Sequence, residues 1–281
     1  MKQRRFDQLD VFSAVPLKGN PLAVVHAAQG LTEATMAAFA RWINLSETTF
    51  LLPPGDPMAD YRVRIFTPGG ELPFAGHPTL GSCHAWLAAG GQPRQAGLVV
   101  QECGVGLVRI RREGARLAFA APPLRRTGPL DEALLARIAA GLGVARAEIL
   151  QHQWVDNGPG WCAVMLSSAE SVRAVRPDFA RLLDINLGLV GAFPPGHPAA
   201  FEVRAFVPSL GVPEDPVTGS LNASVAMWLL GSGRATAPYV ASQGTVLGRA
   251  GRVHVDTDDA GAVWIGGGTV TCVTGSVTIP V

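Results

Sequence analysis

Two copies of one six-residue pattern stand out among the residues that could perform chemistry. Residues 77–82 read His-Pro-Thr-Leu-Gly-Ser, and residues 215–220 read Asp-Pro-Val-Thr-Gly-Ser. Proline lacks an N–H and has a fixed φ, so it suits the first turn of a helix. A helix N-terminus carries free N–H groups and about half a positive charge. We therefore expect two helix starts, with Gly and Ser directing donors at a carboxylate or another developing negative charge.

The first residues of the two patterns, His77 and Asp215, are unlike polar groups. For a single copy, a helix-capping or buried polar residue would be the simpler interpretation. Two copies at corresponding places favour function, with both helix starts facing one cleft.

A third candidate, Glu47, lies in residues 44–50, which read Asn-Leu-Ser-Glu-Thr-Thr-Phe. The corresponding stretch of the second half, residues 184–189, has no acid at the equivalent place. Apolar surroundings disfavour the charged form of a carboxylate and raise its pKa, which suits a general acid/base. A capping box or a surface glutamate remains an equally simple interpretation of this position.

An internal repeat indicates how these residues are positioned. Shifting the chain by 140 residues places residues 63–68 (Val-Arg-Ile-Phe-Thr-Pro) on residues 203–208 (Val-Arg-Ala-Phe-Val-Pro). The same shift places Phe-Ala-Arg of residues 39–41 on residues 179–181, and Ala-Val of residues 23–24 on residues 163–164. After a two-residue length change the six-residue patterns align at a shift of 138. These matches, in one order, predict two copies of one fold.

Each predicted copy contains strands joined by short turns and one buried helix. In the first copy we expect strands at residues 22–26, 61–66, 98–100 and 106–111, and helices at residues 32–43 and 79–87. In the second copy we expect strands at residues 162–166 and 202–206 and near Val240 and Val253, and helices at residues 177–183 and 218–230. This order predicts an α+β architecture. A Pro-rich linker at residues 122–129 divides domain 1–124, with Glu47 and His77, from domain 125–281, with Asp215.

Composition narrows the class of protein. The 281 residues are 48% hydrophobic and 16% charged, with a net charge of +1. A large core is therefore expected, and there is no basic stripe for nucleic acid or polybasic segment for an anionic membrane. We expect a cytoplasmic protein, because the sequence has neither a signal-peptide h-region nor an apolar run of about 18 residues.

Metal and nucleophilic chemistries are disfavoured. The four cysteines are scattered and predict neither a zinc site nor a disulfide framework; they are Cys83, Cys103, Cys162 and Cys272. A hydrolase using Ser220, Asp215 and His77 is disfavoured because no Gly-x-Ser-x-Gly elbow surrounds the serine.

A set of motifs along the chain resembles the PhzF-like family of phenazine-biosynthesis isomerases. The motifs are Asp-Val-Phe at residues 10–12, Gly-Asn-Pro at 19–21, residues 44–50, Phe-Thr-Pro at 66–68, Gly-His-Pro-Thr at 76–79, residues 215–220, Ser-Gln-Gly at 242–244 and Gly-Arg at 248–249. The resemblance implies a diaminopimelate-epimerase-like fold with two pseudo-symmetric domains and an active site between them. Each domain would be an antiparallel β-sheet or barrel curled around a central helix. It also implies a homodimer and no cofactor.

The resemblance also implies roles for individual residues. Glu47 occupies the place of the acid that moves a proton within a cyclic hydroxyamino acid, and His77 and Asp215 occupy those of groups that bind the substrate and assist. Gly76, Gly219 and Ser220 match substrate-contacting loop positions. The wider superfamily's racemases place a cysteine at each helix start, so a thiol racemase is disfavoured here.

The resulting hypothesis is a cofactor-independent isomerase that acts on a small carboxylate-bearing substrate. The reaction would resemble trans-2,3-dihydro-3-hydroxyanthranilate isomerisation, with Glu47 as general acid/base. The alternative is a non-catalytic metabolite-binding protein on the same fold.

Overall fold

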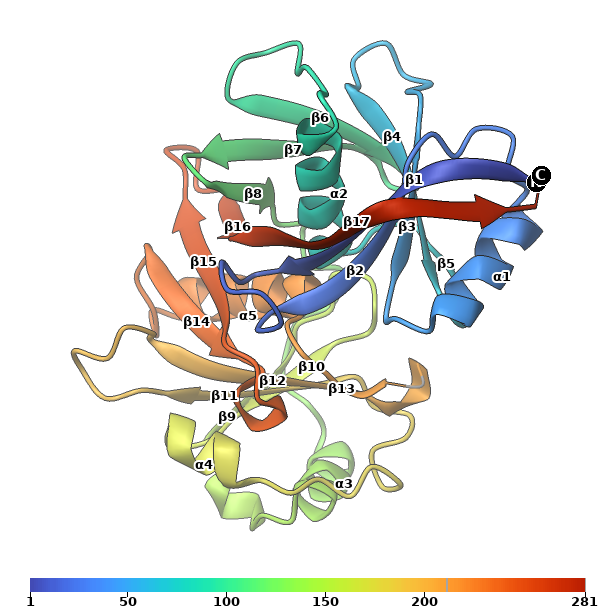
Figure 1. Ribbon diagram of the computed structural model, residues 1–281. Coiled ribbons are helices and arrows are strands. Elements are labelled where there is room, and N and C mark those ends of the chain that lie inside the picture. The colour runs from blue at the N-terminus through green and yellow to red at the C-terminus, as the bar shows by residue number, and fades with distance from the viewer. Residues whose placement is uncertain (211, 281) are drawn as a thin grey trace. The chain divides into compact units, whose positions relative to one another are not determined.

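The computed structural model describes residues 1–210 and 212–280. The chain divides into two compact units (Figure 1). Unit 1 comprises Met1–Ala120 with Gly266–Val281, and unit 2 comprises Ala121–Ile265. No helix within the described residues is long and apolar enough to cross a membrane.

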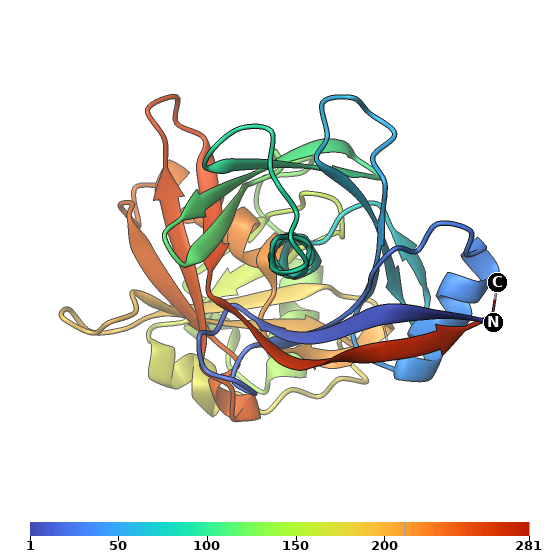
Figure 2. The ribbon, with the colours of Figure 1, turned by 45° about the horizontal axis from the view of Figure 1, so that its top comes forward.

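The described residues of unit 1 form nine strands and two α-helices. The strands are β1 (Lys2–Val11), β2 (Asn20–Val25), β3 (Thr48–Leu52), β4 (Tyr61–Thr67), β5 (Gly70–Leu72), β6 (Leu98–Cys103), β7 (Gly106–Glu113), β8 (Arg116–Ala120) and β17 (Thr269–Ile279). The helices are α1 (Glu33–Ile43) and α2 (Gly76–Ala88). Helix α2 contacts β1, β2, β3, β6, β8 and β17, and Figure 2 shows it end-on with strands on several sides.

Helix α1 forms where its caps predict. The hydroxyl of Thr32 accepts from Thr35 N at 3.1 Å, which satisfies one free N–H of the first turn. Asn44 ends the helix in the left-handed conformation. The buried face of α1 packs Phe39 on Phe50, with ring centroids 6.2 Å apart. This cluster anchors the segment that leads to Glu47.

Unit 2 contains three α-helices and a second set of strands. The helices are α3 (Glu132–Leu142), α4 (Ala169–Ala174) and α5 (Gly219–Gly231). The strands are β9 (Gln151–Trp154), β10 (Cys162–Met165), β11 (Leu187–Ala192), β12 (Phe201–Val207), β13 (Val212–Asp215), β14 (Tyr239–Gln243) and β15 (Gly251–Thr257); β16 (Val263–Gly267) crosses the boundary between units in the sequence. Three short 3-10 helices occur at Arg146–Glu148, Pro208–Leu210 and Thr245–Leu247.

The same order of strand pairings occurs in both units. In unit 1, β2 pairs with β3 in parallel, β4 with β3 and β5 antiparallel, and β4 with β6 in parallel. The same relations recur in unit 2, where β10 pairs with β11 in parallel, β12 with β11 and β13 antiparallel, and β12 with β14 in parallel. The expectation of purely antiparallel sheets is therefore wrong. Helix α1 follows β2 and returns the chain parallel to β2, and helix α2 follows the β4–β5 hairpin and returns the chain parallel to β4.

The repeat continues through the six-residue patterns with a different register from the one predicted. Leu72 pairs with Ile65 in unit 1, and Asp215 pairs with Ala205 in unit 2. The segment between the paired residues is therefore three residues longer in unit 2 than in unit 1, not two residues shorter. Gly76 consequently corresponds to Gly219, because each is the first residue of its helix.

The two patterns therefore differ in structure. His77 lies in the first turn of α2 as predicted, whereas Asp215 ends β13 and precedes α5. Within α2, a Cβ on Gly81 would lie 2.4 Å from Leu22 Cδ2, and Ser82 Oγ donates to Thr49 Oγ1 at 3.0 Å. The Gly-Ser of the first pattern serves helix packing, which corrects the expectation that it contacts a ligand.

Two other expectations about elements need correction. The helix expected at residues 177–183 is a turn, and α4 lies at Ala169–Ala174 instead. Ser168 caps α4 by accepting from Ser171 N at 3.1 Å. This serine is a local signal for a helix start, but the internal repeat favoured a helix at residues 177–183 instead. Helix α3 was not predicted, although Asp131 caps its start and Gly143 its end.

The predicted domain boundaries differ from the two units. The first unit ends at Ala120, near the linker, but Gly266–Val281 belongs to unit 1 and not to the second domain. The reason is that β17 pairs antiparallel with β1 along the whole of β1, from Lys2 opposite Ile279 to Val11 opposite Thr269.

Candidate active site

In unit 1 the structure brings Glu47 and His77 together. Glu47 Oε2 lies 3.4 Å from His77 Nε2. The glutamate occupies the short connection between α1 and β3, where the left-handed Asn44 turns the chain out of the helix. His77 is held in the first turn of α2. The site therefore rests on two elements that the unit's core fixes.

His77 is buried, and its charge state follows from that burial. Removal from water disfavours the imidazolium and lowers the pKa of His77 to about 3, against the opposing effect of the Pro21 carbonyl. The ring is therefore neutral near neutral pH. A neutral imidazole beside a carboxylate can donate a hydrogen bond from one nitrogen and accept one at the other.

A buried asparagine, which the sequence reasoning did not assign to the site, connects this pair to its surroundings. Asn20 Nδ2 lies 3.3 Å from His77 Nδ1, and Ser46 Oγ donates to Asn20 Oδ1 at 3.4 Å. The Gly-Asn-Pro motif was the available signal, but only the fold places it against α2. Asp10 supports the same loop, because its Oδ2 accepts from Lys18 N and Gly19 N at 2.6 and 2.8 Å.

The start of α2 lacks a side-chain cap. Its N-cap residue is Ala75, so no side chain satisfies the first N–H groups of the helix, which begins at Gly76. Thr79 Oγ1 donates to Ala75 O at 2.9 Å and accepts from Gln101 Nε2 at 3.1 Å, which fixes the first turn to β6. This end of the helix is suited to binding an anion.

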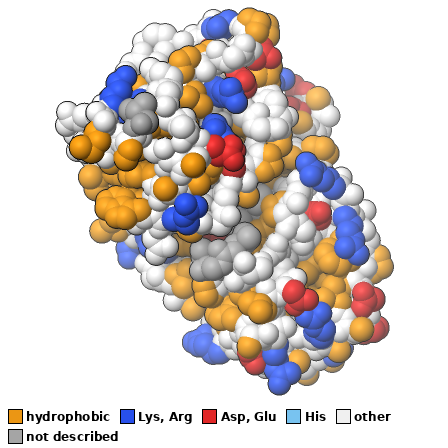
Figure 3. All heavy atoms as spheres, turned by 90° about the vertical axis from the view of Figure 1, so that its right-hand side faces the viewer, with side chains coloured by type: hydrophobic (Ala, Val, Ile, Leu, Met, Phe, Trp, Pro, Cys, Tyr) orange, Lys and Arg blue, Asp and Glu red, His pale blue; other side chains and the backbone are white. Residues whose placement is uncertain are grey.

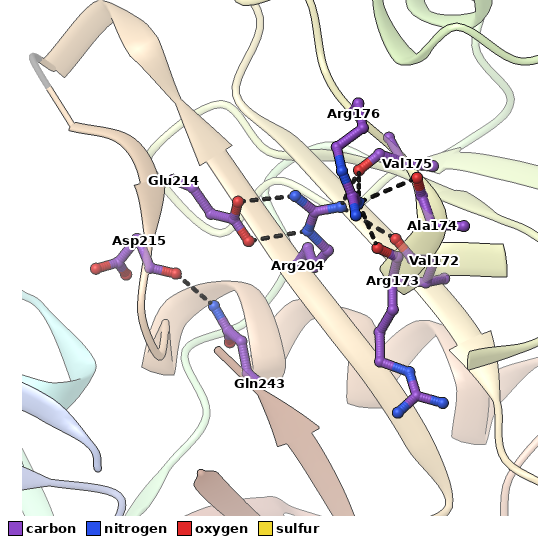
Figure 4. A network of polar contacts seen from close by, with 9 residues as sticks. All are labelled: Val172, Arg173, Ala174, Val175, Arg176, Arg204, Glu214, Asp215 and Gln243. Carbon is purple, nitrogen blue, oxygen red and sulfur yellow. Dashed lines mark hydrogen bonds and ion pairs between the residues drawn. The ribbon is translucent and has the colours of Figure 1, made fainter. Parts of the chain in front are cut away.

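In unit 2, Asp215 is buried and held from two directions. Thr218 Oγ1 donates to Asp215 Oδ2 at 2.5 Å. Gln243 Nε2 donates to the Asp215 carbonyl at 3.0 Å, as Figure 4 shows. Gln243 Oε1 accepts from Thr218 N at 3.0 Å and from Asn222 Nδ2 at 2.7 Å. One buried amide thus ties the end of β13 to the first turn of α5. This amide was not predicted as a site residue, although it belongs to the Ser-Gln-Gly motif.

Gly219 and Ser220 open helix α5. Ser220 Oγ accepts from Trp161 Nε1 at 3.1 Å, and the Ser220 carbonyl accepts from Asn157 Nδ2 at 3.0 Å. Because indole N–H only donates, the Ser220 hydroxyl has its own proton available for another acceptor. Trp161 and Asn157 lie in a Gly/Pro-rich loop whose sequence carries no recognisable site motif.

An ion pair fixes the strand that carries Asp215. Arg204 donates from Nε to Glu214 Oε1 at 2.9 Å and from Nη2 to Glu214 Oε2 at 2.8 Å (Figure 4). Arg204 Nη1 also donates to the carbonyls of Val172 and Val175 at the end of α4, at 3.1 and 2.8 Å. The guanidinium thereby links β12, β13 and α4.

The described residues contain no group of three or more His, Cys, Asp or Glu side chains arranged to hold a metal ion. On the face drawn in Figure 3, Lys and Arg are interspersed with acidic and apolar side chains. Of the six predicted site residues, Glu47, Gly76 and His77 lie in unit 1, and Asp215, Gly219 and Ser220 lie in unit 2.

The mixed α/β fold matches the folds of a solved epimerase and of a solved PhzF-family protein. A hydroxyproline epimerase from Agrobacterium vitis, solved with bound trans-4-hydroxy-L-proline, aligns over 98% of this chain and 92% of its own, with a TM-score of 0.58 and 13% identity. A PhzF-family phenazine biosynthesis protein from Enterococcus faecalis aligns over 99% of this chain and 100% of its own, with a TM-score of 0.82 and 25% identity.

The sequence comparisons specify the family. The model of the phenazine biosynthesis-like protein family matches residues 9–275, and the chain belongs to this PhzF family. The trans-2,3-dihydro-3-hydroxyanthranilate isomerase of Pseudomonas aeruginosa is 34% identical, over 92% of this chain and 91% of its own. Antisense-enhancing sequence 1 of Schizosaccharomyces pombe is 35% identical, over 98% of this chain and 99% of its own. The protein is an isomerase of this family.

Proposed function

We propose that this isomerase moves a proton from one carbon to another of a small carboxylate-bearing substrate, with Glu47 as general acid/base. The observation that carries the proposal is the placement of the Glu47 carboxylate 3.4 Å from the buried, neutral His77 ring. A carboxylate on a fixed element can take a proton from carbon in one step and return it in the next.

The proposed reaction is balanced without an external reactant. One C–H bond breaks as Glu47 accepts its proton, and the electron pair shifts a double bond along the substrate. A second C–H bond forms when the protonated Glu47, whose carboxyl proton exchanges with solvent, delivers a proton to a different carbon. Because no electron leaves the substrate, the chemistry requires no redox cofactor.

The remaining site residues have binding roles in this proposal. The free N–H groups at the starts of α2 and α5, at Gly76 and Gly219, suit the substrate carboxylate. The Ser220 hydroxyl, whose oxygen already accepts from Trp161, donates to a substrate oxygen. His77 and Asp215 orient the substrate's polar groups.

The substrate class follows from the relatives and from this chemistry. We propose a cyclic hydroxyamino acid or a close analogue, because a relative 34% identical is named for isomerising trans-2,3-dihydro-3-hydroxyanthranilate. Such a compound carries both the carboxylate that the helix starts would bind and a carbon acid for Glu47.

The test is proton exchange in deuterium oxide. The wild-type protein is incubated with trans-2,3-dihydro-3-hydroxyanthranilate and analogues, and NMR measures deuterium incorporation and product formation. Glu47→Gln removes the proton acceptor but keeps its size, so we expect unchanged ligand-induced thermal shifts and a loss of turnover of about 100-fold or more. Full activity of Glu47→Gln would refute the role of Glu47. Tight binding without exchange by the wild type would favour a binding protein instead.

The finer architecture also forms part of the proposal. We propose that the strands of each unit close around its buried helix as a barrel, which makes the units pseudo-symmetric. The support is that α2 contacts six strands of unit 1, and that unit 2 repeats the same order of pairings.

We further propose that the protein is a homodimer. Strand β17 runs for 11 residues without a charged side chain, and such strands readily pair with another chain. Light scattering during size-exclusion chromatography measures the mass, and Val273→Lys places a charge on this strand. We expect a dimeric wild type and a monomeric variant; a monomeric wild type would exclude the dimer.

A further inference from the structure

His77 can carry its proton on either ring nitrogen, and the two tautomers have opposite consequences for Glu47. With the proton on Nε2, the ring presents a donor to the carboxylate 3.4 Å away. With the proton on Nδ1, the ring presents a lone pair to that carboxylate and opposes its ionised form. The group that contacts Nδ1 therefore sets what the ring does at the site.

That group is the side chain of Asn20, the first residue of β2. Asn20 is fully buried, and its Nδ2 lies 3.3 Å from His77 Nδ1. Its other end is also occupied, because Ser46 Oγ donates to Oδ1 at 3.4 Å. With the hydroxyl donating to the oxygen, the amide nitrogen is left to face the ring, and an amide NH₂ can only donate.

The second unit supports the same direction of donation. A shift of 140 residues aligns β2 with β10, and at this shift Trp161 corresponds to Pro21. Trp161 is therefore next to residue 160, which corresponds to Asn20. It donates from Nε1 to Ser220, the second residue of α5, just as His77 is the second residue of α2. Indole cannot accept, so this direction is fixed by chemistry. In both units a residue at the start of the strand, or just before it, presents an N–H to the second residue of the buried helix.

We propose that Asn20 is a positioning residue that holds His77 in the Nε2–H tautomer, with the proton directed at Glu47. Asn20 donates to Nδ1, so the neutral ring keeps its single proton on Nε2. The Nε2–H then stabilises the Glu47 carboxylate when it is ionised and ready to accept a proton from carbon. This role rests on the proposed function of Glu47, whereas the tautomer itself does not.

The tautomer is read directly by ¹⁵N NMR of the protein labelled on its histidine rings. The His77 signals are assigned by their loss in His77→Gln, and the His26 ring, held by Asp7 Oδ2 at 2.7 Å, serves as an internal reference. We expect Nδ1 of His77 to show the shift of an unprotonated nitrogen and Nε2 that of a protonated one. A proton on Nδ1 in the wild type would overturn the proposal.

Two substitutions test whether Asn20 is the cause. Asn20→Asp offers only acceptors, so the ring proton moves to Nδ1 and the doubly protonated ring appears at higher pH. Asn20→Leu removes the polar group, so both tautomers become populated. Trp161→Phe is the matched control and leaves the His77 signals unchanged. If Nδ1 stays unprotonated and Nε2 protonated in Asn20→Leu, Asn20 does not set the tautomer.

Turnover separates this inference from the proposed function. In the deuterium-exchange assay, Asn20→Asp lowers the exchange rate by about 10- to 100-fold, because the ring no longer presents a donor toward the charged Glu47 carboxylate. The pH at which exchange is half-maximal also shifts, which a purely structural defect would not cause. If the wild type exchanges no proton, the proposed function fails while the tautomer measurement stands. If the tautomer shifts but exchange does not, the positioning role is wrong.

Discussion

At the scale of single residues, His77 and Ser220 occupy equivalent places at the starts of two buried helices. Each contacts an N–H from the start of a strand or from the loop just before it, yet one is a neutral imidazole and the other a hydroxyl. Only the imidazole has a carboxylate, Glu47, within 3.4 Å of its ring. The repeat thus supplies two equivalent positions, and the differences between copies place the proposed acid/base pair in unit 1.

The burial of His77 predicts a pH dependence of stability. Its pKa is lowered from 6.5 to about 3 in the folded chain, so between these values the unfolded chain holds a proton that the folded chain does not. The free energy of unfolding therefore falls as the pH falls below 6.5, by about 1.4 kcal/mol per pH unit for this group. From about pH 7.5 to about pH 5 the wild type should lose about 2 kcal/mol more than His77→Gln.

Urea denaturation of both proteins at these two pH values measures the difference. Other titrating groups, including the pair of Asp7 and His26, are present in both proteins and cancel in the comparison. Equal pH dependence of the two proteins would mean that His77 is protonated with its ordinary pKa in the folded state.

At the scale of elements, the two Arg–Glu pairs show what the repeat preserves and what it changes. Arg64 pairs with Glu71 and Arg204 pairs with Glu214, each arginine lying over a phenylalanine ring at 5.1 and 4.9 Å. The side chains of the first pair are 20% and 35% exposed, whereas those of the second are 2% and 8% exposed. The same Arg–Glu ion pair is therefore partly exposed in unit 1 and buried in unit 2.

This difference in exposure predicts that the same Glu→Gln substitution lowers the free energy of unfolding by different amounts in the two units. Glu214→Gln leaves the buried guanidinium of Arg204 without its counter-charge and should lower the free energy of unfolding by about 3 kcal/mol. Glu71→Gln removes a partly exposed pair, and solvent screening limits its cost to about 1 kcal/mol or less. Chemical denaturation at neutral pH gives both values. Equal costs would contradict the assignment of Arg204 as a buried tie between β12, β13 and α4.

Elements with strong local signals were predictable from the sequence, and those fixed by distant contacts were not. Thr32 marks the start of α1, and the apolar run after residue 218 marks α5, close to their observed bounds. The register of the second six-residue pattern was wrong because the longer connection after β12 carries no distinctive residue. Glu47 and His77 were predicted from residue type and motif, and the structure places their side chains 3.4 Å apart. The contact of Asn20 with His77 was not, because it joins residues 57 apart in the sequence.

At the scale of the whole molecule, the first unit is completed by the last strand of the chain. Strand β17 pairs with β1 along its length, and Ile279 packs in the cluster that contains Phe39 and Phe50. The sequence places these residues in the predicted second domain, because the residues of a strand do not indicate which other strand it pairs with. Strand pairing between the two ends of a chain is a long-range contact that only the folded state reveals.

Completion of unit 1 by β17 predicts the effect of a deletion and of its rescue. A chain that ends at Gly268 lacks β17, which leaves β1 without its partner and opens the cluster around Phe39. We expect this chain to lose cooperative thermal unfolding and to be cleaved rapidly by protease within unit 1.

Lys2 lies opposite Ile279, so residues 269–280 fused ahead of Met1 through a short Gly/Ser linker can re-form the antiparallel pair. This permuted chain should regain cooperative unfolding, measured by circular dichroism. If the deletion alone unfolds cooperatively at the wild-type temperature, β17 is dispensable and the assignment of Gly266–Val281 to unit 1 has no energetic basis.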